Sequence, residues 1–250
     1  MRVTFVGTGR CIDRPGSNAV ANMIEVGNAV YFVDCGAPVA DALLRLGKDP
    51  ASVRAVFTTH CHSDCTAGIF FFADLVNWAW RECTLRVFLT TQAMIAATER
   101  LILAALSGGG RIDHDRLSFL LADAGRVYED ELVTVDYISP RHVAKGSSPS
   151  YAILLTERAS GKRALFSGAS PYGIAEDGLP GETIADTDLF VCGLSRQGVA
   201  ELLPRVAGYG GLLCLEHLGD SDGEAAALVA ALSAHGIRAI APTDGEWLEV

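Results

Sequence analysis

The chain has 250 residues, of which 50% are hydrophobic and 20% charged, so a disordered protein is excluded and a sizeable core is expected. The formal net charge of −10, from 30 acidic and 20 basic residues, argues against broad nucleic-acid binding. Seven cysteines are an odd number and too low a density for a disulfide framework, so we expect a reducing, cytoplasmic setting. Gly7 ends the first apolar run too early for a signal peptide, so we expect none. The sequence also lacks an apolar run long enough to span a membrane, so we expect no membrane span.

Short apolar runs bounded by glycine, proline or asparagine predict strands, and stretches with helical spacing of apolar residues predict helices. The predicted strands are, in chain order, Arg2–Val6, Asn18–Val26, Ala29–Asp34, Val53–Thr59, Leu85–Leu89, Leu132–Ile138, Tyr151–Thr156, Arg163–Phe166, Leu189–Cys192, Leu212–Leu215, Arg238–Ala241 and Glu246–Val250. The predicted helices are Asp41–Leu46, Ile69–Trp80, Thr91–Leu106, Asp115–Ala122, Val199–Val206 and Glu224–Ala234. This order favours an α/β protein with two mixed sheets and helices outside.

No internal repeat, linker or low-complexity segment interrupts the chain, so residues 1–250 are predicted to form a single domain. Residues 91–125 lie between two strand-rich halves and contain three consecutive glycines, which provide a flexible joint. We expect this region to be helical and consider it a lid over the functional site. An ordinary pair of surface helices is the alternative.

The most informative feature is His60-Cys61-His62-Ser63-Asp64, which follows a predicted strand where the chain turns toward a helix. Histidines two positions apart on extended chain point the same way, and the carboxylate two positions further continues the row. Imidazole and carboxylate are ligands that Zn²⁺ accepts. A chance cluster of surface histidines is the alternative, but this spacing in a chain with six histidines favours a metal site.

These residues resemble a known family. Residues 58–68 look like the His-x-His-x-Asp-His motif of the metallo-β-lactamase superfamily and the glycine that follows it. Further segments are similar to other family motifs in the expected order, the third-histidine segment being like that of the ribonuclease Z-like branch: Phe32–Gly36, Ser139–His142 with Ser150-Tyr151, Leu165–Gly168, Leu213–His217 and Asp244-Gly245. The first motif is highly specific. The other motifs are weak alone and support the resemblance because they occur in the order expected for the family. The resemblance implies an αββα sandwich.

The family usually binds two metal ions, bridged by an aspartate. Carried over by resemblance, the first site consists of His60, His62 and His142, and the second keeps Asp64 and His217. A solvated loop histidine is the alternative for His142, and a histidine that caps a neighbouring helix is the alternative for His217.

Two positions depart from the family pattern. Cys65 stands where the fourth motif residue is normally histidine, and Ala169 stands where the bridging aspartate is expected. A methyl group cannot coordinate, and a cysteine sulfur reaches less far than the distal imidazole nitrogen, so Cys65 is a metal ligand only if the metal or the loop shifts. We therefore predict one Zn²⁺, or a strong and a weak site, with Mn²⁺ or iron as alternative metals.

Other residues near these motifs have two interpretations each. Asp34 either orients a metal-bound histidine or forms a turn. Cys35, Cys61 and Cys65 are either small buried hydrophobic residues or a thiolate or redox group. Three arginines either meet an anionic substrate or are ordinary surface charges: Arg10, Arg14 and Arg141.

Three functions follow from this reading. The first is a metal-dependent hydrolase of a small phosphodiester or related ester, in which Asp64 orients the water or accepts its proton and His217 binds a second metal or assists the leaving group. The second is a non-catalytic binding or regulatory relative. The third is a thiol-based or oxygen-handling metal protein that uses Cys65. The expected partner is a small anionic substrate, not a nucleic acid or a membrane, and a homodimer is compatible with the sequence.

Overall fold

The computed structural model describes residues 1–9, 17–36, 38–106, 110–139, 149–168, 181–193, 199–218 and 222–250. One group of strands comprises β1 (Arg2–Gly7), β2 (Ala21–Val26), β3 (Ala29–Val33), β4 (Val53–Phe57), β5 (Leu85–Leu89), β6 (Leu117–Leu121) and β14 (Trp247–Glu249). The other comprises β7 (Gly125–Glu129), β8 (Val133–Ile138), β9 (Ala152–Glu157), β10 (Arg163–Phe166), β11 (Leu189–Gly193), β12 (Leu212–Glu216) and β13 (Ala239–Ile240). The helices are α1 (Val39–Arg45), α2 (Ser63–Trp78), α3 (Gln92–Ala105), α4 (Gly181–Ala185), α5 (Val199–Val206) and α6 (Asp222–Ala234), with a 3-10 turn at Pro50–Ser52.

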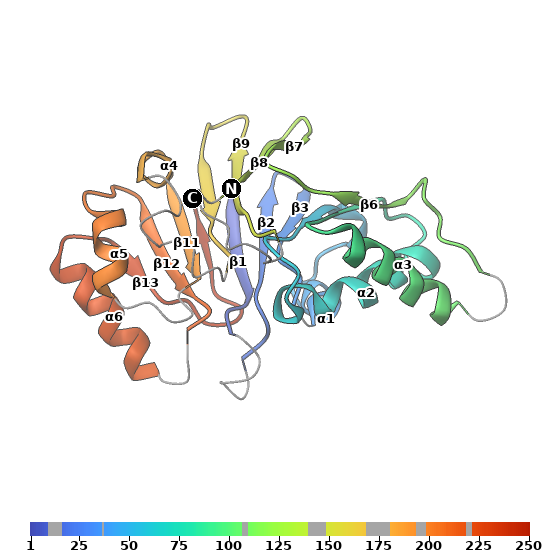
Figure 1. Cartoon of the computed structure of the whole chain (residues 1–250), viewed down its shortest axis with the longest axis horizontal. Helices are drawn as coiled ribbons and strands as arrows, with labels where there is room; N and C mark the ends of the chain where they lie inside the picture. The colour runs from blue at the N-terminus through green and yellow to red at the C-terminus, as the bar shows by residue number, and fades with distance from the viewer. Residues whose placement is uncertain are drawn as a thin grey trace.

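The strands form two mixed seven-stranded sheets, in the orders β14-β1-β2-β3-β4-β5-β6 and β13-β12-β11-β10-β9-β8-β7. Helices α1, α2 and α3 pack on the outer face of the first sheet, and α4, α5 and α6 pack on the outer face of the second (Figure 1). A third apolar cluster fills the space between the sheets. This arrangement is the αββα sandwich that the resemblance implied, and the predicted fold class is confirmed.

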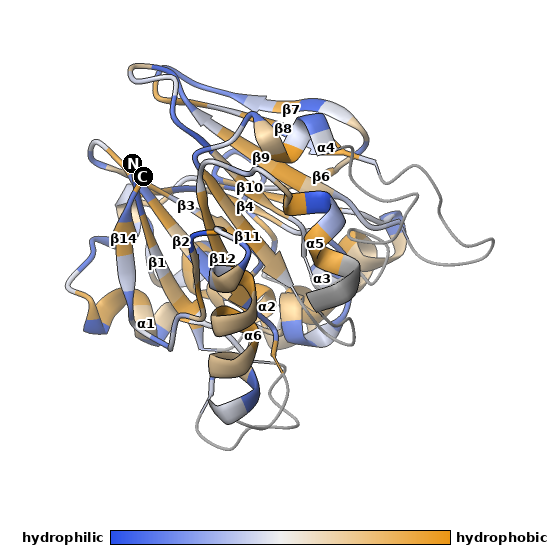
Figure 2. Ribbon diagram, turned by 90° about the vertical axis from the view of Figure 1, so that its left-hand side faces the viewer, coloured by the Kyte–Doolittle hydropathy of each residue, from blue (hydrophilic) through white to orange (hydrophobic). Residues whose placement is uncertain are grey.

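Alternation along the strands explains why the central strands are apolar throughout. In β3, Val30 and Phe32 face the helices, whereas Ala29, Tyr31 and Val33 face the opposite sheet. Because both faces of the strand are covered, all five side chains are buried. Figure 2 shows the same pattern as apolar colouring along the strands of both sheets.

The prediction for the region 91–125 is partly wrong. Residues 115–122 were expected to be helical because Leu117, Leu120 and Leu121 have helical spacing, but Leu117–Leu121 is strand β6. It pairs in parallel with β5, from Leu85↔Leu117 to Leu89↔Leu121, and so satisfies the main-chain hydrogen bonds of β5. The region therefore holds one long helix, α3, which packs against α2, β5 and β6 rather than a helix pair. A lid function for it stays a prediction.

The topology gathers several strand ends at one edge. Strands β3, β4 and β5 run in parallel in the first sheet, and β10, β11 and β12 run in parallel in the second. The carboxyl ends of parallel strands meet at the same edge of a sheet, where ligand sites are commonly built. Among the described residues, no helix has the length and apolar character needed to cross a membrane.

Candidate metal centre

The turn after β4 carries the motif that the sequence singled out. Strand β4 ends at Phe57, and α2 begins at Ser63 with His62 as its N-cap residue. His60 therefore lies in the turn itself, whereas Asp64 lies in the first turn of α2, where a negative charge is favourable near the helix N-terminus. A strand end and a helix start thus bring the three side chains together on one short stretch of chain.

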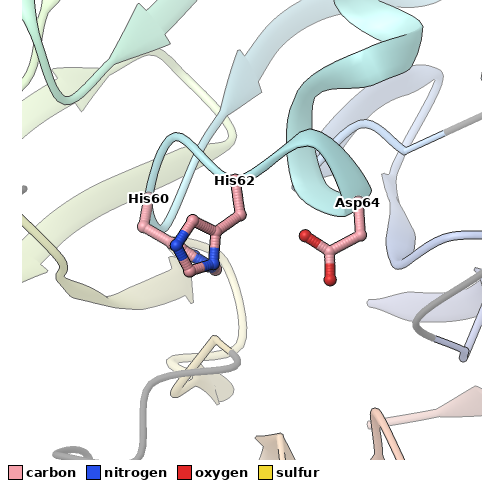
Figure 3. A group of neighbouring side chains, drawn as sticks. All are labelled: His60, His62 and Asp64. Carbon is pink, nitrogen blue, oxygen red and sulfur yellow. The ribbon is translucent and has the colours of Figure 1, made fainter. Parts of the chain in front are cut away.

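The three side chains converge. One ligand atom each from His60, His62 and Asp64 lies within 4.8 Å of the others, and we refer to these residues as the ligand group. The two imidazole rings have their centroids 4.5 Å apart and meet at 72°. In Figure 3 the rings lie close together and the Asp64 carboxylate is turned toward them. His60 is buried, Asp64 is half-buried and His62 is exposed, so the group is open to solvent on one side.

His60 is supported from beneath by Asp34. The Thr59 hydroxyl lies 2.8 and 3.0 Å from the two Asp34 oxygens and 3.0 Å from Nδ1 of His60, and the Thr59 main-chain N–H donates to Asp34 at 2.8 Å. With Asp34 ionised, the hydroxyl donates to the carboxylate and accepts from Nδ1–H, which leaves Nε2 of His60 as the ligand atom. Burial, and then the neighbouring His62 ring, lower the pKa of His60 to about 4, so this imidazole is uncharged near neutral pH.

Close backbone contacts bind this turn to its surroundings. A Cβ at Gly68 would collide with the carbonyl oxygen of Gly36, so α2 approaches the turn after β3 as only glycine allows. Gly168 has φ +65°, and a Cβ there would lie 2.6 Å from the Thr59 hydroxyl oxygen. The segment after β10 is therefore seated directly against the residue that supports His60. Ala169, the predicted replacement for a bridging aspartate, lies outside the described residues.

His217 reaches the ligand group from the second sheet. It follows β12, and its Nε2 lies 3.5 Å from the nearer Asp64 carboxylate oxygen. Its main-chain N–H donates to the carbonyl oxygen of Thr8 at 2.7 Å. His217 and Asp34, with φ of +60° and +57°, are the two non-glycine residues with positive φ in the described ranges. Backbone strain of this kind concentrates at functional sites, and here both cases flank the ligand group.

Glu216 was not singled out by the sequence beyond its place before His217. It is buried, and Asn22 on β2 donates to its Oε2 at 3.0 Å. Burial raises the pKa of Glu216 to about 8, against this hydrogen bond and with the charge of Asp34 adding to the rise. Burial likewise raises the pKa of Asp34 to about 7, although hydrogen bonds from Thr59 oppose it. Within the described part of the chain, neither carboxyl is paired with a lysine or arginine.

Cys65 lies outside the ligand group. Its side chain is fully buried and hydrogen-bonded to the Asp34 carboxyl, and burial raises the pKa of its thiol well above the usual range. Its carbonyl oxygen accepts a hydrogen bond from the main chain of Cys35 at 2.7 Å. In the absence of a metal ion the thiol therefore stays protonated near neutral pH. The ligand role predicted for it stays a prediction.

His142 lies outside the described residues, but the chain on both sides of it is placed. Strands β8 and β9 pair up to Ile138↔Ala152, and the main-chain N–H of Tyr151 donates to the carbonyl oxygen of Thr59 at 2.9 Å. The segment that carries His142 is thus connected at its downstream end to the residue before His60. The three candidate arginines also lie outside the described residues: Arg10, Arg14 and Arg141.

A hollow of about 440 Å³ lies between β12, β13 and α6, and neither His217 nor the ligand group lines it. It is lined by Thr8, Gly9, Glu216 and Leu218 and by residues of α6, of β13 and of the segment that follows β13. Its size is within the range of small-molecule sites.

Comparison with known proteins agrees with this geometry. The sequence model of the family described as Anti-Pycsar protein Apyc1 matches residues 1–171. The chain belongs to this family. Part of this Apyc1-family chain is also similar to curated proteins named ribonuclease Z. The protein of Methanocaldococcus jannaschii is 27% identical over 88 residues, which are 35% of this chain and 28% of the relative. That of Mycobacterium marinum is 31% identical over 80 residues, 32% of this chain and 28% of the relative, so each alignment spans less than a third of the relative's length.

Solved structures resemble the Apyc1-family chain over its whole length. YhfI from Bacillus subtilis, a metallo-β-lactamase fold protein, has a TM-score of 0.74 at 15% identity and covers 100% of this chain and 99% of its own. Human tRNase Z, short form, has a TM-score of 0.72 at 13% identity, with coverage of 100% and 99%. Zn²⁺-bound PqqB from Methylobacterium extorquens has a TM-score of 0.70 at 11% identity, with coverage of 100% of both chains. The metallo-β-lactamase fold that the sequence resemblance implied is confirmed.

The residues of the centre fit a metal cofactor. Two imidazoles and a carboxylate within 4.8 Å of one another are a donor set for a divalent ion. The lowered pKa of His60 keeps that ring in the form that ligates. The buried carboxyl groups of Asp34 and Glu216 lie beneath the group without a basic partner in the described ranges, so a cation above them would favour their charged forms.

Proposed function

We propose that this protein is a metal-dependent hydrolase that acts on a small phosphodiester or a related ester. The observation that carries the proposal is the convergence of the ligand group, with ligand atoms of His60, His62 and Asp64 within 4.8 Å at the carboxyl end of β4. Membership in a family with the metallo-β-lactamase fold, which the solved neighbours share, supports the same reading.

In this proposal His60 and His62 hold the ion together with His142. When bound, the ion lowers the pKa of a coordinated water and polarises the ester. Asp64 orients that water or takes up its proton, because its carboxylate is half-buried and lies beside both imidazoles. His217, whose Nε2 lies 3.5 Å from Asp64, assists the leaving group or contributes to a weaker second metal site.

The proposed metal is Zn²⁺. Imidazole and carboxylate suit it, and one similar structure, PqqB, is Zn²⁺-bound. Mn²⁺ and iron are the alternatives, because the same ligands accept them. We favour one ion, or a strong and a weak one, since the Cys65 sulfur is not among the ligand atoms that converge within 4.8 Å.

The proposed substrate is small and anionic. Curated relatives are named ribonuclease Z, and a similar solved structure is described as a diphosphatase from the PhnP family, so cleavage of phosphate linkages recurs among similar proteins. The net charge of −10 disfavours a long nucleic acid. A cytoplasmic location and a homodimer stay predictions.

The test combines metal analysis with turnover. We expect the purified protein, loaded with Zn²⁺, to retain about one ion per chain and to hydrolyse bis-p-nitrophenyl phosphate. His62→Ala should lower kcat/KM by more than about 100-fold, beyond the 10–100-fold typical of residues that only support a ligand. His114→Ala is the matched control, because His114 is exposed and lies outside the ligand group, and it should leave both quantities unchanged.

Two outcomes would contradict the proposal. Absence of bound zinc, manganese or iron after loading with each would remove the metal centre. A bound metal without turnover of this or other small phosphodiesters would instead indicate the non-catalytic binding or regulatory protein that the sequence also allowed.

A further inference from the structure

Asp244 lies far from the His-x-His-x-Asp motif in sequence, but hydrogen bonds connect it to the metal centre. It lies between β13 and β14, in a turn closed by hydrogen bonds from Glu246 N–H to the Thr243 carbonyl oxygen and from Thr243 N–H to the Glu246 carboxylate. The adjacent Gly245 N–H donates to the carbonyl oxygen of Phe5 at 2.7 Å. The turn is therefore fixed both internally and to β1, which gives Asp244 a defined position.

The Asp244 carboxylate binds both ends of the connection between β1 and β2. One oxygen accepts from the main-chain N–H and the hydroxyl of Thr8, each at 2.9 Å, and lies 3.5 Å from the Ser17 hydroxyl. The other oxygen accepts from the main-chain N–H of Asn18 at 2.5 Å. A single carboxylate thus joins the residue after β1 to the residues that precede β2.

Thr8 transmits this arrangement to the metal centre. Its carbonyl oxygen accepts the main-chain N–H of His217 at 2.7 Å, and His217 has a φ of +60° that most residues avoid. The hydrogen bond from His217 to Thr8 helps to hold this conformation, in which Nε2 lies 3.5 Å from Asp64. The path from Asp244 to the main chain of His217 therefore consists of two hydrogen-bonded steps.

We propose that Asp244 is a positioning residue: by fixing Thr8, it holds the main chain of His217 so that the imidazole stays against Asp64. This inference deepens the proposed function, on which its relevance to hydrolysis rests. Asp244 itself is not a ligand in the proposal and does not touch substrate. The positioning role can be examined without metal or substrate. Its direct effect is to protect the main-chain N–H of His217 from hydrogen exchange.

The experiment compares Asp244→Asn and Thr8→Val with Glu246→Ala. Asp244→Asn places an amide N–H₂ against N–H donors, and Thr8→Val removes the hydroxyl bond while it keeps the carbonyl that His217 uses. Glu246→Ala is the matched control, because it removes a hydrogen bond of the same turn but none to Thr8. The first readout is hydrogen exchange at the main-chain N–H of His217, followed by NMR, and the second is the Zn²⁺ dissociation constant.

For Asp244→Asn we expect exchange at His217 to accelerate at least about tenfold. We also expect Zn²⁺ binding at the weaker second site, to which His217 contributes, to weaken by about 10-fold or more. Thr8→Val should give a smaller change in the same direction, and Glu246→Ala none. The inference is overturned if Asp244→Asn leaves exchange at His217 unchanged, or if Glu246→Ala reproduces its effects. Should the wild-type protein hydrolyse nothing, the exchange readout still decides the positioning role.

Discussion

His60 and His217 approach the same centre, but they are supported in different ways. His60 is held through its side chain, by the Thr59 hydroxyl and the buried Asp34 carboxyl beneath it. His217 is held through its main chain, by the carbonyl oxygen of Thr8. The first support lies in the turns that follow β3 and β4 of the first sheet, and the second joins the two sheets. A short motif can therefore be positioned by its own neighbourhood, whereas a histidine from a distant strand depends on contacts between distant segments.

The comparison also separates tautomer control from placement. The support at His60 reaches Nδ1 and so decides which nitrogen is free to ligate. The support at His217 is a hydrogen bond to its main-chain N–H, so it fixes the position of the backbone from which the imidazole extends. Loss of the first should change metal affinity most directly, and loss of the second should change the geometry between the sheets.

The largest expected effect comes from removing the side-chain support of His60. Thr59→Val keeps the shape of the side chain but removes the hydroxyl between Asp34 and Nδ1. We expect Zn²⁺ affinity, measured by chelator competition, to fall by about 10–100-fold. The free energy of unfolding should fall by about 1–3 kcal/mol, because a buried carboxyl loses a donor.

Thr58→Val provides the control for this prediction. The Thr58 hydroxyl is equally buried and donates to the carbonyl oxygen of Phe88 at 2.9 Å, away from His60. We expect a similar loss of stability in urea denaturation with little change in Zn²⁺ affinity. Equal affinity losses in the two variants would mean that the Thr59 hydroxyl has no specific role.

A smaller effect is expected in the pH dependence of the metal-free protein. Burial raises the pKa of Glu216 to about 8 and that of Asp34 to about 7, whereas both titrate near pH 4 when unfolded. The folded state then binds more protons than the unfolded state between these values, so its free energy of unfolding falls as pH rises. His60, with a folded pKa of about 4, acts in the opposite direction, but only below about pH 6.5.

Between pH 6.5 and 8 we therefore expect the free energy of unfolding, measured in urea, to fall by roughly 2 kcal/mol. Glu216→Gln should remove more than half of this slope, because a glutamine does not titrate. Asp41→Asn, at an exposed position on α1, should leave it unchanged. A slope that is the same in Glu216→Gln and the wild type would show that Glu216 does not carry the effect.

The smallest expected effect is at Cys65. Its thiol is buried and its pKa is raised, and a serine hydroxyl can still donate to Asp34. We expect Cys65→Ser to bind the same amount of metal as the wild type, and the Co²⁺-substituted wild-type protein to lack thiolate-to-cobalt absorption. A thiolate band that disappears in Cys65→Ser would favour the thiol-based metal protein that the sequence allowed.

The sequence predicted the sandwich and the ligand group because both depend on local patterns. Apolar strands covered on both faces, and His-x-His-x-Asp at a strand end, are visible in a few adjacent residues. Strand β6 was missed because leucines at 117, 120 and 121 satisfy helical spacing, and only pairing with β5 decides between the two structures. The roles of Thr8 and Glu216 depend on contacts with residues about 200 positions away, for which a single sequence carries no direct sign.

The left-handed backbone at positions 34 and 217 has a consequence for variation at these sites. Aspartate, asparagine and histidine tolerate this region better than most residues, and branched side chains are the least tolerated. At 217, asparagine or glycine would relieve the peptide but delete the imidazole, whereas glutamate or cysteine would offer a donor atom on an ill-suited backbone. In a saturation library, position 217 should therefore accept few replacements, and those that preserve folding should differ from those that preserve chemistry.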